Sequence, residues 1–289
     1  MVTDKNLAHE YNSTGIVLLK GFLAEKDVNM YRAALEAEFL DNKKVYIGYD
    51  EVEVSRKLVE TIISSRLSDV LNNIFSEAII LPDFIIQSGN TPNKIITPHY
   101  DCQSYVRQGM SDRLETLKYA KIGVYLQASD KNLPGSIWYC PFSHNNAFHK
   151  ILWRLPIPTR LKNKIDNFYK NFKKSSHIAL NCEPGDLVIF DGRLLHSSSP
   201  KLKTTPENIA KKIAIYFSVT GSELDAASFM RAETLKFADE LTSKDPEYAM
   251  RIGYFFSELS NVLSTQCTKV GLKSYSLNSD KIMYSKSKL

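Results

Sequence analysis

The stretch from Ala78 to Val219 constrains the fold most, because its apolar residues come in short runs instead of long helical patterns. The runs are rich in β-branched and aromatic residues and are separated by Pro, Gly, Asn and Asp. They read AIILPDFIIQ, NTPNKIIT, YAKIGVYLQA, GSIWYC, GDLVIF and KIAIYFSV. Several short strands between turn residues are typical of an antiparallel sandwich or barrel. We therefore expect a mainly β core.

Helical patterns flank this β region on both sides. A short apolar strand is expected over 15–20, followed by a helix in which apolar residues recur every three or four positions from Val28 to Phe39. A second helix is expected over 55–75. Beyond Gly221 the helical pattern returns, with a start near Asp245-Pro246.

The domain organisation follows from these patterns, since neither an internal repeat nor a low-complexity linker divides the chain of 289 residues. We expect one domain over 1–221, consisting of the β core and its N-terminal helices. Residues 222–289 are expected to form a C-terminal helical extension packed on the same domain.

Composition and charge limit the partners. The chain has 37 Lys+Arg and 32 Asp+Glu, a net charge of +5, but no basic stripe interleaved with aromatics, so we expect no nucleic-acid partner. Residues 158–173 are expected to be a charged surface insertion with some helix. The basic groups Arg160/Lys162/Lys164 and Lys173/Lys174 are expected to be solvated faces.

The cysteines and the apolar segments point to a location. Four widely spaced cysteines without a CxxC pair favour a reducing compartment. The N-terminus lacks the apolar region of a signal peptide, and no apolar stretch is long enough for a membrane span. We therefore expect a soluble cytoplasmic protein without an integral membrane segment.

Two histidines lie in settings that suggest a metal site. In Pro98-His99-Tyr100-Asp101 the alternation of a strand would put His99 and Asp101 on one face, about 6.6 Å apart along the strand. His196 follows the buried run GDLVIF and a turn. Two imidazoles and one carboxylate form the facial triad of non-haem Fe(II) oxygenases.

These motifs resemble the phytanoyl-CoA dioxygenase branch of the Fe(II)/2-oxoglutarate-dependent oxygenases. The similarity runs from about residue 10 to 220 and includes NSTGIVLLKGFLAEKDV, HYD, NLPGSIWYCPFSHN and GDLVIFDGRLLHSSSP. The resemblance implies a double-stranded β-helix, a jelly-roll barrel similar to cupins. It also implies iron bound by the catalytic residues His99, Asp101 and His196, with 2-oxoglutarate and O2 as co-substrates.

The cation for the far carboxylate of 2-oxoglutarate departs from the family pattern. The family usually places an Arg on the strand after the distal His, but here no Arg follows His196 until Arg231. Lys211 and Lys212 are the alternatives, and strand parity favours Lys212 because it shares the smaller, more polar face. Arg193 is a rival, and a solvated strand end is the structural alternative for both lysines.

Other pocket residues follow from the same resemblance and from parity. Ser198 matches a family position whose hydroxyl contacts 2-oxoglutarate. Tyr125, Gln127 and Gln87 are expected to line the cavity, with a structural role as the alternative for each. For the substrate we expect contacts with Tyr105, Arg107 and Trp138, whereas His144 in the PFSH turn is expected to be structural.

The predicted activity is hydroxylation of an unactivated C–H bond of a small molecule, with release of succinate and CO2. Halogenases that resemble this family carry Ala or Gly at the carboxylate position, so Asp101 favours hydroxylation, while desaturation, epoxidation and cyclisation stay open. Arg107, Arg113 and the Lys201/Lys203 loop favour an anionic substrate. The alternatives are a cupin-like metal enzyme without 2-oxoglutarate and a non-catalytic binding barrel. A homodimer through the C-terminal helices is a further prediction.

Overall fold

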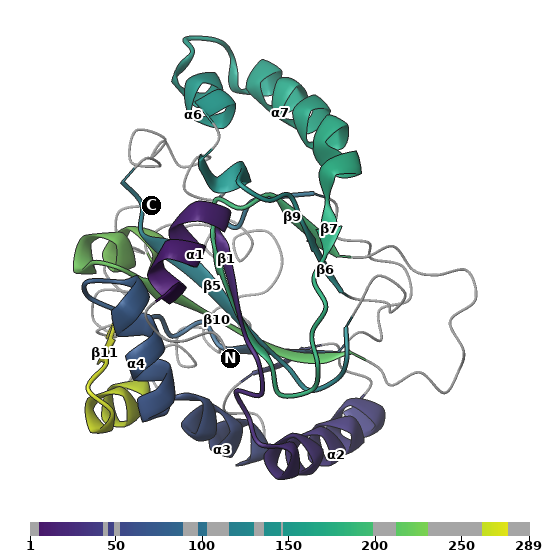
Figure 1. Ribbon diagram of the computed structural model, residues 1–289, viewed down its shortest axis with the longest axis vertical. Coiled ribbons are helices and arrows are strands. Elements are labelled where there is room, and N and C mark those ends of the chain that lie inside the picture. The colour runs from purple at the N-terminus through teal and green to yellow at the C-terminus, as the bar shows by residue number, and fades with distance from the viewer. Residues whose placement is uncertain are drawn as a thin grey trace, which may run out of the picture.

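Two facing β-sheets form the centre of the molecule (Figure 1). The computed structural model describes residues 6–42, 46–48, 53–88, 98–102, 116–129, 136–145, 147–198, 212–230 and 262–276. The larger sheet has the order β1-β8-β5-β10-β3-β11, and β4 pairs with both β10 and β2. The smaller sheet has the order β7-β6-β9. All pairings of named strands except β11 with β3 are antiparallel.

The strands are short, as the turn-rich sequence predicts. The larger sheet consists of β1 (Ile16–Leu19), β2 (Tyr46–Gly48), β3 (Ile79–Ile80), β4 (Ile85–Ser88), β5 (Tyr119–Tyr125), β8 (Leu187–Asp191), β10 (Ile213–Thr220) and β11 (Lys273–Ser274). The smaller sheet consists of β6 (Ile137–Tyr139), β7 (Ile178–Ala179) and β9 (His196–Ser198). The mainly β core with flanking helices is therefore confirmed.

Four N-terminal helices cover the outer face of the larger sheet. They are α1 (Leu7–Thr14), α2 (Glu25–Asn42), α3 (Glu53–Ile62) and α4 (Ser65–Ile74). The side chains of Ile122, Ile189 and Phe217 share one apolar core with helix residues such as Leu35 and Leu58. Successive residues of a strand point to opposite faces, so the alternate residues of β5, β8 and β10 face the smaller sheet.

The N-terminal region differs from the sequence expectation in two places. The single helix expected over 55–75 is two helices, because Ser64 begins a new one and its hydroxyl accepts a hydrogen bond from the Leu67 amide. The helix α1 precedes the first strand and was not expected. It belongs to the fold, since Tyr11 is buried and its ring lies edge-on to Phe75 at 5.7 Å.

The C-terminal region returns to the sheet. Residues 223–230 and 262–269 are helical, and Leu263 and Cys267 join the core on the outer face of the larger sheet. Strand β11 then pairs in parallel with β3. The helix start expected at Asp245-Pro246 lies outside the described residues, and the division at residue 221 stays a prediction.

The expected surface insertion is a helical pair between β6 and β7. It contains α6 (Ala147–Arg154) and α7 (Thr159–Lys173), with a short 3₁₀ turn on either side, Ser143–Asn145 and Lys174–Ser176. In Figure 1 the two helices lie at the top of the view, at the end of the molecule opposite α2 and α3. Among the described helices, none combines the length and the apolar character needed to cross a bilayer.

Candidate metal centre

His99, Asp101 and His196 meet at the rim of the smaller sheet. The amide of His99 donates to the carbonyl of His196 at 2.9 Å, and the amide of His196 donates back at 3.0 Å. This antiparallel bridge fixes the segment that carries His99 and Asp101 beside β9. Two positions that are 97 residues apart in the sequence are therefore held by main-chain hydrogen bonds.

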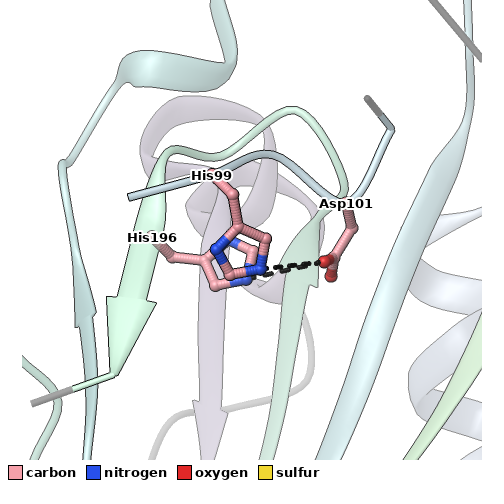
Figure 2. A group of neighbouring side chains, drawn as sticks. All are labelled: His99, Asp101 and His196. Atoms are coloured by element: carbon pink, nitrogen blue, oxygen red, sulfur yellow. Dashed lines mark ion pairs between the residues drawn. The ribbon is translucent and has the colours of Figure 1, made fainter. Parts of the chain in front are cut away.

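The three side chains converge on one point (Figure 2). The Nε2 atoms of His99 and His196 lie 3.5 Å and 3.6 Å from Oδ1 of Asp101. The two imidazole centroids are 4.2 Å apart, and one ligand atom from each residue lies within 4.8 Å of the others. Two nitrogens and one carboxylate oxygen are the donor set of the facial triad, so this group could hold a metal ion such as Fe(II).

A second hydrogen bond orients the His196 ring. Its Nδ1 lies 2.9 Å from the carbonyl oxygen of Leu194. A carbonyl only accepts hydrogen bonds, so Nδ1 carries the proton and Nε2 keeps its lone pair on the side of Asp101. Phe190 of β8 packs edge-on against the same imidazole, at 4.9 Å between centroids. A side chain of the larger sheet thus packs against the imidazole that the smaller sheet presents.

The charge states of the group suit metal binding. Burial lowers the pKa of His196 to about 4, with a further contribution from His99 that outweighs the opposing effect of Asp101. Burial alone would raise the pKa of Asp101, but His196, His99 and Lys121 hold it well below its usual value. At neutral pH the site therefore presents a neutral imidazole at His196 and a carboxylate at Asp101, which are the forms that bind metals.

The inner face of the larger sheet gathers several of the predicted co-substrate residues. Gln87 and Tyr125 both lie opposite Ala214, one on each side of β10. Nζ of Lys212 lies 5.2 Å from the ring centroid of Tyr216 and 5.9 Å from that of Tyr125. Lys212 thus lies beside two tyrosines of the inner face, and its contact with 2-oxoglutarate stays a prediction.

Tyr125 and Tyr216 lie next to each other on this face. Their hydroxyls are 3.2 Å apart, and the rings meet edge-to-face at 6.3 Å between centroids. Burial and the neighbouring Tyr216 raise the pKa of Tyr125 well above its usual value. The Tyr125 hydroxyl therefore stays protonated. Because the two hydroxyls bond to each other, one of the two O–H groups is left to donate to a further acceptor.

Three other predicted residues have contacts of their own. Oε1 of Gln127 accepts from the Ile213 amide at 2.6 Å, which ties the end of β5 to β10. The guanidinium of Arg193 binds the Asp191 carboxylate at 2.8 Å and 2.6 Å, so its charge is paired. Ser198 lies on β9 two residues after His196, on the same face because strands alternate. Of the three, Ser198 is the one that shares a strand with a candidate metal ligand.

Of the three predicted substrate residues, the described part of the chain includes Trp138 alone, and Trp138 is not directed at the triad. Trp138 pairs with Ser197 and Tyr139 pairs with His196, so Trp138 points to the opposite face of the smaller sheet from His196. Its indole nitrogen is buried without a hydrogen-bond partner among the described residues. Lys211, Tyr105 and Arg107 lie outside the described residues. The roles predicted for all four stay predictions.

A charged cluster on the inner face was not predicted. Nζ of Lys121 binds Oδ2 of Asp83 at 2.7 Å and the hydroxyl of Ser218 at 3.0 Å, and the Tyr119 hydroxyl lies 3.2 Å from the Ser218 hydroxyl. Lys121 also contributes to the low pKa of Asp101. The signal was present in the sequence, because Lys121 is the one charged residue within the buried strand β5 and shares parity with Tyr125.

The insertion reaches the metal centre through Tyr100, the residue between His99 and Asp101. Nζ of Lys170 on α7 lies 4.9 Å from the centroid of the buried Tyr100 ring. The same ammonium binds Asp166 one turn earlier at 2.7 Å, and both side chains are buried. The inner face of α7 therefore packs on the segment that presents two of the three candidate ligands.

Comparisons with known proteins agree on the fold. A family model described as phytanoyl-CoA dioxygenase (PhyH) matches residues 11–204, about two thirds of the chain. No curated protein matches the sequence. The three solved structures described next have 15% or 16% sequence identity to the chain, so they bear on the fold alone.

Two of these structures are of non-haem enzymes, and the third holds nickel and 2-oxoglutarate. SnoK, an alpha-ketoglutarate-dependent carbocyclase of nogalamycin biosynthesis, has a TM-score of 0.55 and 16% identity over 76% of this chain and 84% of its own. SnoN, an epimerase of the same biosynthesis, has a TM-score of 0.52 and 16% identity over 75% and 82%. HygX from Streptomyces hygroscopicus, with nickel and 2-oxoglutarate bound, has a TM-score of 0.53 and 15% identity over 77% and 88%. The fold is thus the expected jelly roll.

Proposed function

The chain belongs to the phytanoyl-CoA dioxygenase family, and from this premise we propose that it hydroxylates an unactivated C–H bond of a small molecule at an iron held by His99, Asp101 and His196. Enzymes of this family use Fe(II), 2-oxoglutarate and O2, and the chain is an enzyme of that class. The two alternatives, a cupin-like metal enzyme that does not use 2-oxoglutarate and a non-catalytic binding barrel, are therefore not proposed.

The convergence of the three candidate ligands is the observation that carries this proposal. The donor set fits Fe(II), since two neutral imidazoles and a carboxylate leave one face of an octahedral ion open for co-substrates. The iron, when bound, supplies oxidative decarboxylation of 2-oxoglutarate to succinate and CO2, coupled to oxidation of the substrate. The chain supplies the positions: main-chain hydrogen bonds hold His99 beside His196, and Leu194 fixes the His196 ring.

Lys212 is the cation proposed for the far carboxylate of 2-oxoglutarate. It lies on the inner face over the rings of Tyr125 and Tyr216, whose hydroxyls bond to each other and leave one O–H to donate to a ligand. Gln87 lies on the same face and Ser198 follows His196 on β9. Arg193 is the weaker candidate, because a buried guanidinium already paired with Asp191 would have to give up that pair.

The outcome of the oxidation depends on where the substrate is held. Asp101 occupies the position of the carboxylate ligand, which favours hydroxylation over halogenation. The neighbours include an epimerase and a carbocyclase, so the same fold serves other oxidative outcomes in those proteins. An anionic substrate bound by Arg107, Arg113 or the Lys201/Lys203 loop and covered by Tyr105 remains part of the proposal, as does a contact from Trp138.

Three further features belong to the same proposal. The residues 1–221 would carry the reaction, and the extension 222–289 would pack on them and could pair two copies into a homodimer. The enzyme would act in the cytoplasm. Sedimentation velocity on the full chain tests the homodimer, because it distinguishes a monomer from a dimer.

Succinate release tests the proposed activity. The purified chain with Fe(II), 2-oxoglutarate and O2 is expected to form succinate slowly, and faster with its substrate, when screened against a panel of anionic and neutral metabolites. Asp101→Ala is expected to lose this activity. Succinate formation that does not require iron, or that is unchanged in Asp101→Ala, would contradict the proposal. Stimulation by neutral metabolites alone would contradict only the anionic substrate.

A further inference from the structure

The exposed apolar side chains of the described residues are concentrated on the helical insertion. Six of the eleven large hydrophobic side chains that are exposed there lie between 148 and 172. They are Phe148, Ile151, Leu155, Leu161, Phe168 and Phe172. Single exposed apolar residues are ordinary on protein surfaces, whereas a contiguous group of them marks an interaction site.

Helix α7 is apolar on the side where a surface helix is normally polar. Phe168 is 74% exposed and Phe172 is 70% exposed, and with Leu161 they recur at spacings of seven and four, which is one helix face. The buried face carries the ion pair Asp166–Lys170 instead. Folding of this chain therefore does not account for the phenylalanines, because the packed side of the helix is the charged one.

The two helices of the insertion are fixed relative to each other and to the body. The Phe148 ring of α6 stacks on the Tyr169 ring of α7 at 4.4 Å between centroids. Lys170 anchors α7 on Tyr100, as described above. Figure 1 shows both helices at one end of the molecule, beyond the smaller sheet. Both helices thus hold their exposed apolar side chains in fixed positions at this end of the molecule, and we call these six side chains with their helices the insertion surface.

This surface is also the basic part of the chain. Residues 147–173 contain seven Lys or Arg and one Asp, a net charge of +6, while the whole chain carries +5. The rest of the chain is therefore close to neutral. Arg160 and Lys164 are exposed. They lie on the same side of α7 as Leu161 and Phe168, because residues three or four positions apart are neighbours on the surface of a helix.

We propose that α6 and α7 dock the protein on an anionic lipid surface. Helices that lie in a membrane interface combine Phe and Leu on one face with flanking Lys and Arg, which is the pattern seen here. The apolar side chains would enter the boundary between headgroups and acyl chains, and the cations would face the acidic headgroups.

The charges disfavour the other occupants of this surface. A second copy of the chain docking through the same face would bring +6 against +6, which opposes association. A nucleic acid would neutralise the cations but would leave Ile151, Leu161 and both phenylalanines without an apolar partner. Only a surface that is both acidic and apolar within a few ångströms matches both features.

Vesicle co-sedimentation of the full chain tests the proposal. The protein is expected to bind phosphatidylcholine vesicles that contain phosphatidylserine, to release them at high salt, and to leave pure phosphatidylcholine vesicles unbound. Phe168→Ser with Phe172→Ser, and separately Arg160→Gln with Lys164→Gln, should each weaken binding about tenfold or more. Met30→Ser on α2, an exposed apolar residue outside the insertion, is the matched control and should bind like the wild type.

Several results would overturn the proposal. Equal binding to both kinds of vesicle, no binding to either, or binding unaffected by both double variants would each do so. Self-association that Phe168→Ser with Phe172→Ser abolishes, in the absence of vesicle binding, would assign the face to a second copy. Heparin binding that needs Arg160 and Lys164 but not the phenylalanines, again without vesicle binding, would assign it to a soluble polyanion. All variants change exposed side chains, so thermal unfolding should match the wild type.

Discussion

The Nδ1–H of His196 donates to the carbonyl oxygen of Leu194 at 2.9 Å, and this bond leaves the Nε2 lone pair available to a metal ion. Main-chain hydrogen bonds in both directions also join His99 to His196. The candidate centre is therefore preorganised by the backbone of the smaller sheet. Preorganisation of this kind lowers the cost of assembling the ligands around an ion.

The pKa of His196 predicts a pH dependence of the metal-free protein. The pKa of His196 is about 4 in the folded protein and 6.5 ordinarily. Below pH 6.5 His196 therefore binds a proton in the unfolded chain but stays neutral in the folded chain. The contribution of His196 to the free energy of unfolding is fully present above pH 6.5. It falls as the pH drops toward about 4, by at most about 1.4 kcal/mol per pH unit.

Urea unfolding of the metal-free protein between about pH 7 and pH 4.5 measures this effect, because His196 of the unfolded chain takes up its proton in that range. His196→Gln removes the titrating group, so its stability should fall less steeply with acid than that of the wild type. The five other histidines are shared by both proteins and cancel in the comparison. Parallel profiles for the two proteins would contradict the lowered pKa.

Lys212 should determine the affinity for 2-oxoglutarate. Lys212→Met removes the cation proposed for the far carboxylate, and the KM for 2-oxoglutarate should rise about ten- to a hundredfold, the range for a lost charged hydrogen bond. The kcat at saturation should change little, and Lys212→Arg should recover most of the affinity. Lys211→Met is the control. If Lys211→Met raised the KM and Lys212→Met did not, the assignment would pass to Lys211.

The ion pair between Lys121 and Asp83 should stabilise the inner face only as a pair. Their side chains are 17% and 13% exposed, so Lys121→Met leaves a largely buried carboxylate without its cation and should cost about 3 kcal/mol of unfolding free energy. Combining it with Asp83→Asn should recover much of the loss, because Asn keeps hydrogen bonds to Ser218 without the charge. Urea unfolding of the two single variants and the double variant measures the coupling, and strictly additive losses would contradict it.

Features that depend on local alternation could be predicted from the sequence. The parity of the strand after His196 placed Lys212 with Tyr216 on one face, and the contacts of Lys212 with Tyr216 and Tyr125 agree. The three candidate ligands could also be named from the sequence, since residues of the right types flank recognisable strands, and the structure brings their ligand atoms within 4.8 Å of one another. The parity of β5 likewise grouped Tyr125 with the inner face.

Features that depend on distant packing could not. Helix α1 has few apolar residues and is stabilised by contacts such as Tyr11 with Phe75, which no local pattern reveals. The face of Trp138 depends on the register between β6 and β9, which is set by pairing and not by composition. The sequence predicts solvated faces at Arg160/Lys162/Lys164 and Lys173/Lys174. No local pattern shows that Asp166 and Lys170 form the buried side of α7 and leave Phe168 and Phe172 exposed.

The iron complex itself gives the most direct test of the central claim, that His99, Asp101 and His196 hold Fe(II) with 2-oxoglutarate. Without oxygen, Fe(II) and 2-oxoglutarate should give the wild type a weak visible charge-transfer band at roughly 500 nm, an expectation for a keto acid chelated at an open iron site. His9→Ala, which changes an exposed histidine of α1, should keep the band, and His196→Ala should lose it. A wild type without the band, or a His196→Ala variant with a band of equal strength, would contradict the account.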